Sequence, residues 1–196
     1  MLDLYFKFIL NDDDTYLGVE HDKRIVEEWI KHNYFFTGKL FISDDLDVHC
    51  SGEVRIKNKS IESLTNGLFR WGTVNKAFCC ANCENLKSLE GAPKCVGEYF
   101  NCARCKNLTT LEGAPEEVGW SFVCNSCNNL TSLKGAPEKV GGDFYCNKCE
   151  NLKSLEYAPE VDGGKFVYSN CPNLKITDSD RRKYEMRDYS IINYIN

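Results

Sequence analysis

Apolar and polar positions repeat with a period of 22 residues along most of the chain. The pair Asn-Leu recurs five times at this spacing, beginning at Asn85 and ending at Asn173. Around it runs the pattern Phe-x-Cys-x-x-Cys-x-x-Leu-x-x-Leu, which keeps its register from copy to copy. A fixed period of about 20 to 50 residues is typical of repeat proteins, so the pattern predicts a solenoid with one coil per copy.

Each copy begins with a predicted short strand. Side chains alternate along a strand, so the Phe and the first Cys of a copy face the same side and form the core. We expect strands to begin near residues 54, 78, 100, 122, 144 and 166, with Val54–Leu64 as a degenerate first copy. The second Cys of each copy and two columns of Leu continue the core.

The return segment of each coil carries Gly-Ala-Pro, as in Gly135–Pro137. Glycine permits positive φ and proline fixes φ, so this segment is expected to be irregular and free of helix. The prediction is therefore an α+β repeat protein. It is a short solenoid with one parallel sheet and an irregular, helix-poor convex side.

The flanks predict caps, because a bare end coil would expose apolar side chains and strand edges. We divide the chain into an N-terminal cap region (1–50), the solenoid (51–176) and a C-terminal cap (177–196). The expected cap elements are a hairpin near Leu2–Leu10, an amphipathic helix over Lys23–Asn33, a strand-turn-strand unit over Leu40–Val48, a helix from Thr177 through Arg187, and a strand over Tyr189–Ile195.

The repeat Leu-x-Ser-Leu-x-Gly-Ala-Pro-x-x-Val-Gly-Gly-x-Phe-x-Cys resembles that of leucine-rich-repeat proteins encoded by tailed bacteriophages and some bacteria, over residues 36–196. The resemblance implies a leucine-rich-repeat solenoid with no catalytic residues, in a phage or bacterial cytoplasmic setting. The fifth copy departs from the pattern, with Asp162 in the slot of Val140 and Tyr168 in the slot of Cys146. We expect this last coil to be adapted to the C-terminal cap.

Twelve cysteines are the abnormal feature of this 196-residue chain. Four Cys-x-x-Cys pairs have the spacing of a zinc ribbon, but the same spacing follows from the repeat. Buried cysteine packs as a small apolar side chain, so we favour packing, predict no cofactor or metal site, and keep a zinc-binding structural module as the alternative. A thiol enzyme is the weaker alternative, because the three histidines (His21, His32 and His49) lie outside the intact copies.

Charge and hydropathy exclude further classes. Residues 1–50 hold 11 acidic against 5 basic side chains, the remainder holds 18 against 19, and no basic stripe suggests nucleic-acid binding. Apolar stretches fall far short of the roughly 20 residues of a membrane span, and the first residues lack a secretory signal pattern. We therefore expect a cytoplasmic protein that binds neither nucleic acid nor membrane.

The outward strand positions are the candidate binding site, since the fold does not dictate them. Their middle column is more apolar than a solvated sheet requires, which is typical of a protein-binding patch, although β-propensity alone also favours Val and Tyr there. The expected function is capture or inhibition of a host protein, such as a defence component, by a phage protein, with the acidic N-terminal region as a competing site. The predicted partner-binding residues are Tyr99, Asn101, Val123, Asp143, Tyr145, Lys165 and Val167.

Overall fold

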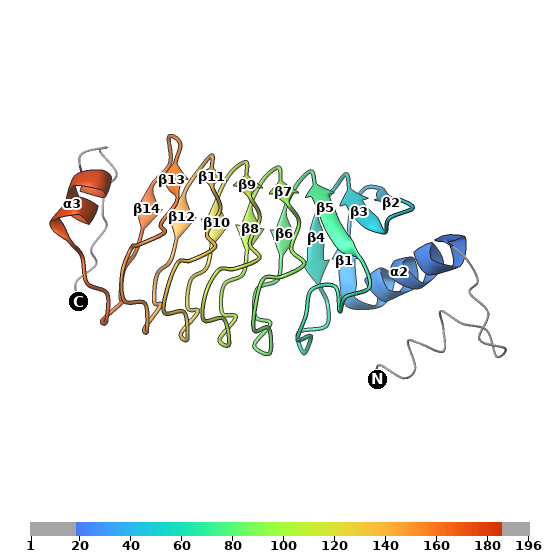
Figure 1. Cartoon of the computed structure of the whole chain (residues 1–196), viewed down its shortest axis with the longest axis horizontal. Coiled ribbons are helices and arrows are strands. Elements are labelled where there is room, and N and C mark those ends of the chain that lie inside the picture. The colour runs from blue at the N-terminus through green and yellow to red at the C-terminus, as the bar shows by residue number, and fades with distance from the viewer. Residues whose placement is uncertain (1–18, 186–196) are drawn as a thin grey trace.

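A computed structural model of the chain describes residues 19–185, which form a rod of stacked coils with a helix at each end (Figure 1). Each regular coil contributes one short strand to each of two seven-stranded sheets that run along the rod. A strand on one side, a turn, and a strand on the other side therefore make one repeat.

The first sheet, which we call the Phe sheet, contains the expected strands of the Phe column. All its neighbouring strands are parallel except the first pair, in which β1 runs antiparallel to β4. The register places each Phe directly opposite the Phe of the next coil. In spatial order the strands are β1 (Tyr34–Phe36), β4 (Val54–Ile56), β6 (Phe78–Cys79), β8 (Phe100–Asn101), β10 (Phe122–Val123), β12 (Phe144–Tyr145) and β14 (Phe166–Val167).

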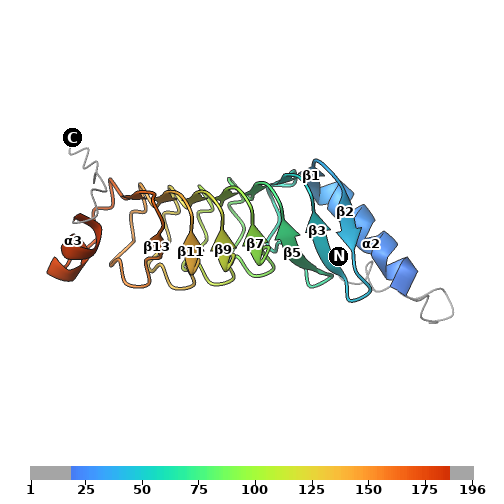
Figure 2. The ribbon, with the colours of Figure 1, turned by 90° about the horizontal axis from the view of Figure 1, so that it is seen from above.

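The second sheet, which we call the Val sheet, contains in its regular coils the two-residue strands that end at Val96, Val118, Val140 and Val161. Figure 2 shows its strands in a row along the rod. Its last pair is antiparallel, between β3 and β2, and its other pairs are parallel. In spatial order the strands are β13 (Glu160–Val161), β11 (Lys139–Val140), β9 (Glu117–Val118), β7 (Cys95–Val96), β5 (Arg70–Val74), β3 (Asp47–Cys50) and β2 (Leu40–Ile42).

The expected class, a short repeat solenoid with caps, is confirmed, as are the six expected strand positions. The expectation of a single sheet is wrong, because the Val sheet forms a second one. Val118 and Val140 face the core with 2% and 0% exposure, and the amide of Gly141 donates to the carbonyl of Val118 at 2.9 Å. Segments of two residues thus become strands through burial and backbone pairing. They are too short to show an alternating pattern in the sequence, so this sheet was not predicted. The Gly-Ala-Pro segments are irregular, as expected, and Gly135 has a φ of +83°. Turns without helix or strand also follow each strand of the Phe sheet.

The fifth coil differs from its expected register by one residue. Val161, rather than Asp162, lies opposite Val140, so the assignment of Asp162 to the valine slot is wrong. Asp162 instead takes the place of Gly141, and its amide donates to the carbonyl of Val140 at 2.9 Å. The turn from Val161 to Phe166 is one residue longer than the turn from Val140 to Phe144, and Gly163 lies in it at a φ of +77°. An apolar side chain is thereby kept in the core at the end of the rod.

The N-terminal cap begins with α2 (Val19–Asn33), which confirms the expected amphipathic helix and starts four residues before the predicted Lys23. Val26, Trp29 and Ile30 form its buried side. The antiparallel pair β2 and β3 confirms the predicted strand-turn-strand unit. The expected hairpin at 2–10 lies outside the described residues.

The C-terminal helix α3 (Asp178–Glu185) confirms the predicted helix over the part of it that the structure describes. Thr177 caps it, because its Oγ1 accepts from the amide of Asp180 at 3.2 Å, and a carboxylate oxygen of Asp180 accepts from the amide of Thr177 at 2.8 Å. Arg187 and the expected strand at 189–195 lie beyond the described range. No helix within residues 19–185 is long and apolar enough to cross a lipid bilayer.

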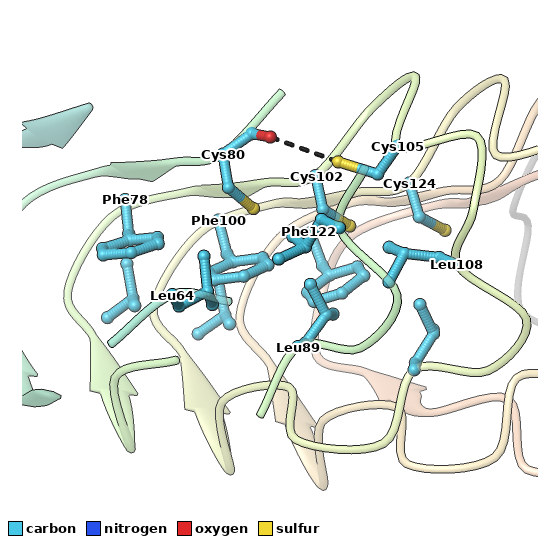
Figure 3. Packing of buried hydrophobic residues seen from close by; sticks show 14 of the residues in the cluster. Leu64, Phe78, Cys80, Leu89, Phe100, Cys102, Cys105, Leu108, Phe122 and Cys124 are labelled. Carbon is cyan, nitrogen blue, oxygen red and sulfur yellow. Dashed lines mark hydrogen bonds between the residues drawn. The ribbon is translucent and has the colours of Figure 1, made fainter. Parts of the chain in front are cut away.

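The core between the two sheets consists of the predicted columns of Phe, Cys and Leu (Figure 3). The rings of Phe100, Phe122 and Phe144 stack with centroids 5.2 Å apart and planes within 13° of parallel. Both values follow from the strand ladder, which repeats every 4.7–4.9 Å by the general geometry of sheets. Full burial of each such side chain stabilises the fold by roughly 1.5–3 kcal/mol.

Candidate binding surface

The second cysteine of each repeat has a structural role. The thiol of Cys105 donates to the carbonyl of Cys80, 25 residues earlier, at 3.2 Å (Figure 3). The same bond joins Cys127 to Cys102 at 3.3 Å and Cys149 to Cys124 at 3.3 Å. Each of these thiols therefore satisfies a carbonyl of the previous coil where its chain turns away from the Phe sheet.

Burial makes the first cysteines poor nucleophiles. Removal from water raises the pKa of Cys80, Cys102 and Cys124 well above the usual range of a thiol. A hydrogen bond from the Cys80 thiol lowers the pKa of Cys105. Cys105 is nevertheless fully buried, with 0% exposure, and a reactant reaches it only if the coil opens.

The histidine side chains lie away from the cysteine columns. His49 is in β3 of the Val sheet, where its Nδ1 accepts from the amide of Thr73 at 3.1 Å. His21 and His32 belong to α2. Over the described part of the chain, no three His, Cys, Asp or Glu side chains gather in an arrangement suited to a metal ion. The thiol-enzyme and zinc-module alternatives therefore remain hypotheses.

The seven predicted binding residues lie on the outer face of the Phe sheet in two adjacent columns. Strand pairing places Asn101, Val123, Tyr145 and Val167 in consecutive coils of β8 to β14 (Figure 1). Tyr99, Asp143 and Lys165 occupy the column two residues earlier along each coil. The structure therefore brings all seven onto one face, and we call the run Val123, Tyr145 and Val167 the apolar strip.

Asp143 holds the centre of this face in place. Its Oδ1 accepts from the amide of Lys165 at 2.7 Å, and its own amide donates to the Oγ of Ser121 at 3.2 Å. The hydroxyl of Tyr145 donates to the other carboxylate oxygen, and this bond raises the pKa of Tyr145 to about 12. The tyrosine ring is thus fixed on the half-buried strip with its hydroxyl protonated at neutral pH.

A polar groove lies beside the apolar strip, just after the strands of the Phe sheet. Asn125, Asn147 and Ser169 line it, and Arg104 and Lys148 stand exposed along it. The repeat predicts that the side chains of Asn125 and Asn147 point outward, but it gives no reason to select them. The 22-residue period places Arg104 and Lys148 in one column, but only the structure shows that this column borders a groove, so the sequence offers no reason to select them.

A second groove lies on the Val-sheet side and has the opposite charge. Its lining includes Glu117, Glu138, Glu160 and Asp162, with Lys139 as its basic residue. Lys139 is paired with Glu117 at 2.7 Å. The two sides of the rod thus present a cationic and an anionic groove, separated by the buried core.

Comparison of the chain with protein-family models, with curated proteins and with solved structures found no match.

Proposed function

We propose that this chain is a non-catalytic module that binds another protein through the outer face of the Phe sheet. In this proposal it is a cytoplasmic phage protein that captures or inhibits a host factor, such as a defence component, and uses no cofactor. The phage setting rests on the resemblance of the repeat to phage and bacterial leucine-rich-repeat proteins. The binding mode rests on the surface itself.

The apolar strip is the observation that carries the proposal. Val123, Tyr145 and Val167 lie side by side in three consecutive coils, although the fold needs no apolar side chain on the outside of a sheet. Tyrosine is enriched in binding hot spots because it offers a large contact area at a low cost in entropy. The bond from Tyr145 to Asp143 lowers that cost further, since the ring is already oriented before a partner arrives.

The test compares Tyr145→Ala with a matched tyrosine elsewhere. Tyr157 is 55% exposed and occupies the slot that glycine fills in earlier coils, so Tyr157→Gly removes a tyrosine without strain. Tagged wild type and both variants are used to capture proteins from a bacterial host lysate, and the partner so identified is purified for titration. We expect Tyr145→Ala to weaken the complex about tenfold or more, at an unchanged melting temperature, and Tyr157→Gly to bind like wild type.

Val123→Asp provides an independent disruption of the same strip. If Tyr145→Ala and Val123→Asp both bind like wild type, while deletion of residues 1–18 or added salt abolishes the complex, the acidic N-terminal region is the binding element. That outcome overturns the proposal, because screening by salt acts on exposed charges and not on an apolar strip.

A further inference from the structure

The polar groove beside the apolar strip is cationic, although the chain as a whole is acidic. The protein carries a net charge of −5, yet the groove lining contains Arg104 and Lys148 and no acidic residue. Within the described residues neither of these side chains forms an ion pair, whereas Lys134 and Lys139 are both paired with glutamates of neighbouring coils. The two cations are therefore exposed and available to a ligand.

The backbone at these two positions is unfavourable for the residues that occupy them. Asn82, Arg104, Ser126, Lys148 and Asn170 form one column, and all five have φ between 54° and 63°. Asparagine tolerates this left-handed conformation better than arginine or lysine does, and it occupies both ends of the column. Local conformation thus favours Asn at positions 104 and 148 as well. Long cations placed there against that preference point to a role for their charge.

Three side-chain amides add hydrogen-bond donors to the groove. The Oδ1 of Asn101 accepts from the amide of Ala103 at 2.9 Å, and the Oδ1 of Asn125 accepts from the amide of Asn147 at 2.8 Å. The Oδ1 of Asn147 accepts from the hydroxyl of Ser169 at 2.9 Å. Because a backbone N–H can only donate, it fixes the orientation of the first two amides and leaves their NH₂ groups free to donate to a ligand.

The spacing of the cations selects the shape of that ligand. Arg104 and Lys148 are two coils apart, which corresponds to about 10 Å along the rod at the usual strand spacing. A peptide in the polyproline II conformation advances about 3.1 Å per residue with three residues per turn, so three residues cover nearly the same distance and bring the side chain back to the same face. Carboxylates at positions i and i+3 of a polyproline II segment lying along the groove would both face the cations. The backbone carbonyls of the same chain would accept from the asparagine amides.

Building on the proposed protein-binding function, we propose that this groove binds an acidic segment of the partner protein in the polyproline II conformation, with carboxylates three residues apart on Arg104 and Lys148. Val123 lines the groove and also belongs to the apolar strip, so the segment would lie alongside the side chain of Tyr145. The apolar strip would anchor the partner through apolar contact. The groove would attract the acidic segment by its charge and orient it along the rod. Electrostatic complementarity of this kind sets specificity and association rate.

The experiment uses a fluorescein-labelled twelve-residue peptide with Glu at every third position, and a matched peptide with Gln in place of Glu. Binding to the full chain is measured by fluorescence anisotropy at low and physiological salt. The test variant is Arg104→Asn with Lys148→Asn, which installs the residue favoured by the left-handed backbone. The control variant, Lys134→Asn with Lys139→Asn, removes the same charge elsewhere on the rod.

We expect the Glu peptide to bind about tenfold or more tightly than the Gln peptide, and the groove variant to lose that difference. The control variant should keep it, and the melting temperature of the groove variant should be equal to or higher than that of wild type. Equal binding of the two peptides, or equal losses in both variants, overturns the inference. A single-stranded oligonucleotide that binds more tightly than the Glu peptide, with the same dependence on Arg104 and Lys148, overturns it in favour of a phosphate polymer.

The two proposals fail separately. If the peptides do not bind but Tyr145→Ala still loses the captured partner, the protein-binding function stands and the acidic segment is wrong. If the Glu peptide binds through Arg104 and Lys148 while Tyr145→Ala captures the partner normally, the groove stands and the apolar strip is not the anchor.

Discussion

The central coils and the N-terminal cap both bury aromatic rings, but the rings meet at different angles. Phe122 and Phe144 stack with planes 4° apart, whereas Trp71 meets Phe69 and Phe78 edge to face, at 76° and 74°. Isolated aromatic pairs prefer offset or edge-to-face geometry over a face-to-face sandwich. The junction between the cap and the first coil therefore follows the preference of the rings, whereas the ring geometry in the central coils is set by the strand ladder.

The difference shows what stabilises each region. In the central coils, identical residues in parallel register must lie one above another, so stability comes from burial and from the backbone bonds between coils. Where the cap packs on the first coil, side chains from α2, β1 and β5 meet from several directions around Tyr34, whose hydroxyl donates to the carbonyl of Leu64. The stack can thus propagate through any number of copies, whereas the cap is specific to its own residues.

The largest expected effect is at the centre of the stack. Phe122→Ala should lower the free energy of unfolding by about 3–5 kcal/mol, because both neighbouring rings lose a partner and the rigid ladder cannot close the cavity. Chemical denaturation followed by circular dichroism measures the change, with Val123→Ala on the outer face of the same strand as control. An unchanged denaturation midpoint would show that the Phe column is not the core.

Trp29→Ala in the cap should cost less, about 2–3 kcal/mol, because this ring is 8% exposed and packs at the end of the rod. In a solenoid each coil contacts its neighbours only, so the damage should stay local. Hydrogen exchange should accelerate in α2 and β1 while β10 and β12 remain protected. Uniform acceleration along the rod would contradict the distinction between cap and stack.

A smaller effect is expected at the second cysteine of a central coil. Cys127→Ala removes one of two donors to the carbonyl of Cys102, which keeps the bond from the amide of Cys105 at 3.3 Å, and should cost about 0.5–1.5 kcal/mol. Cys127→Ser supplies a hydroxyl in place of the thiol and should recover part of that loss. Thermal unfolding of the two variants gives the comparison, and a serine variant no more stable than the alanine variant would show that packing alone explains these cysteines.

The regular part of the fold could be predicted because its signal is repeated. Five copies of Asn-Leu establish the period, and the period places Phe122 and Cys124 in the core without further information. The Val sheet could not be predicted in the same way, since a two-residue strand such as β9 shows no alternation. The shift that brings Val161 opposite Val140 was missed for a related reason, because a strict period assigns the wrong residue once the chain gains or loses one position.

In the candidate site, too, the period predicts some features and only the structure shows the others. The period alone predicts that Asn101, Val123, Tyr145 and Val167 share an outward column, and strand pairing places them there. The hydrogen bond that fixes Tyr145 on Asp143 needs side-chain geometry. The left-handed backbone at Arg104 and Lys148 needs backbone geometry, because arginine and lysine give no sequence signal for positive φ.

By itself, the sequence determined the repeat unit, the direction in which most of its side chains face, and the existence of caps, because each follows from a periodic arrangement of apolar residues. Tertiary structure alone decided how many sheets the coils form, how the fifth coil keeps a valine in the core, and which polar side chains line one groove. These features depend on contacts between residues about 22 positions apart, where backbone pairing between coils overrides local preference.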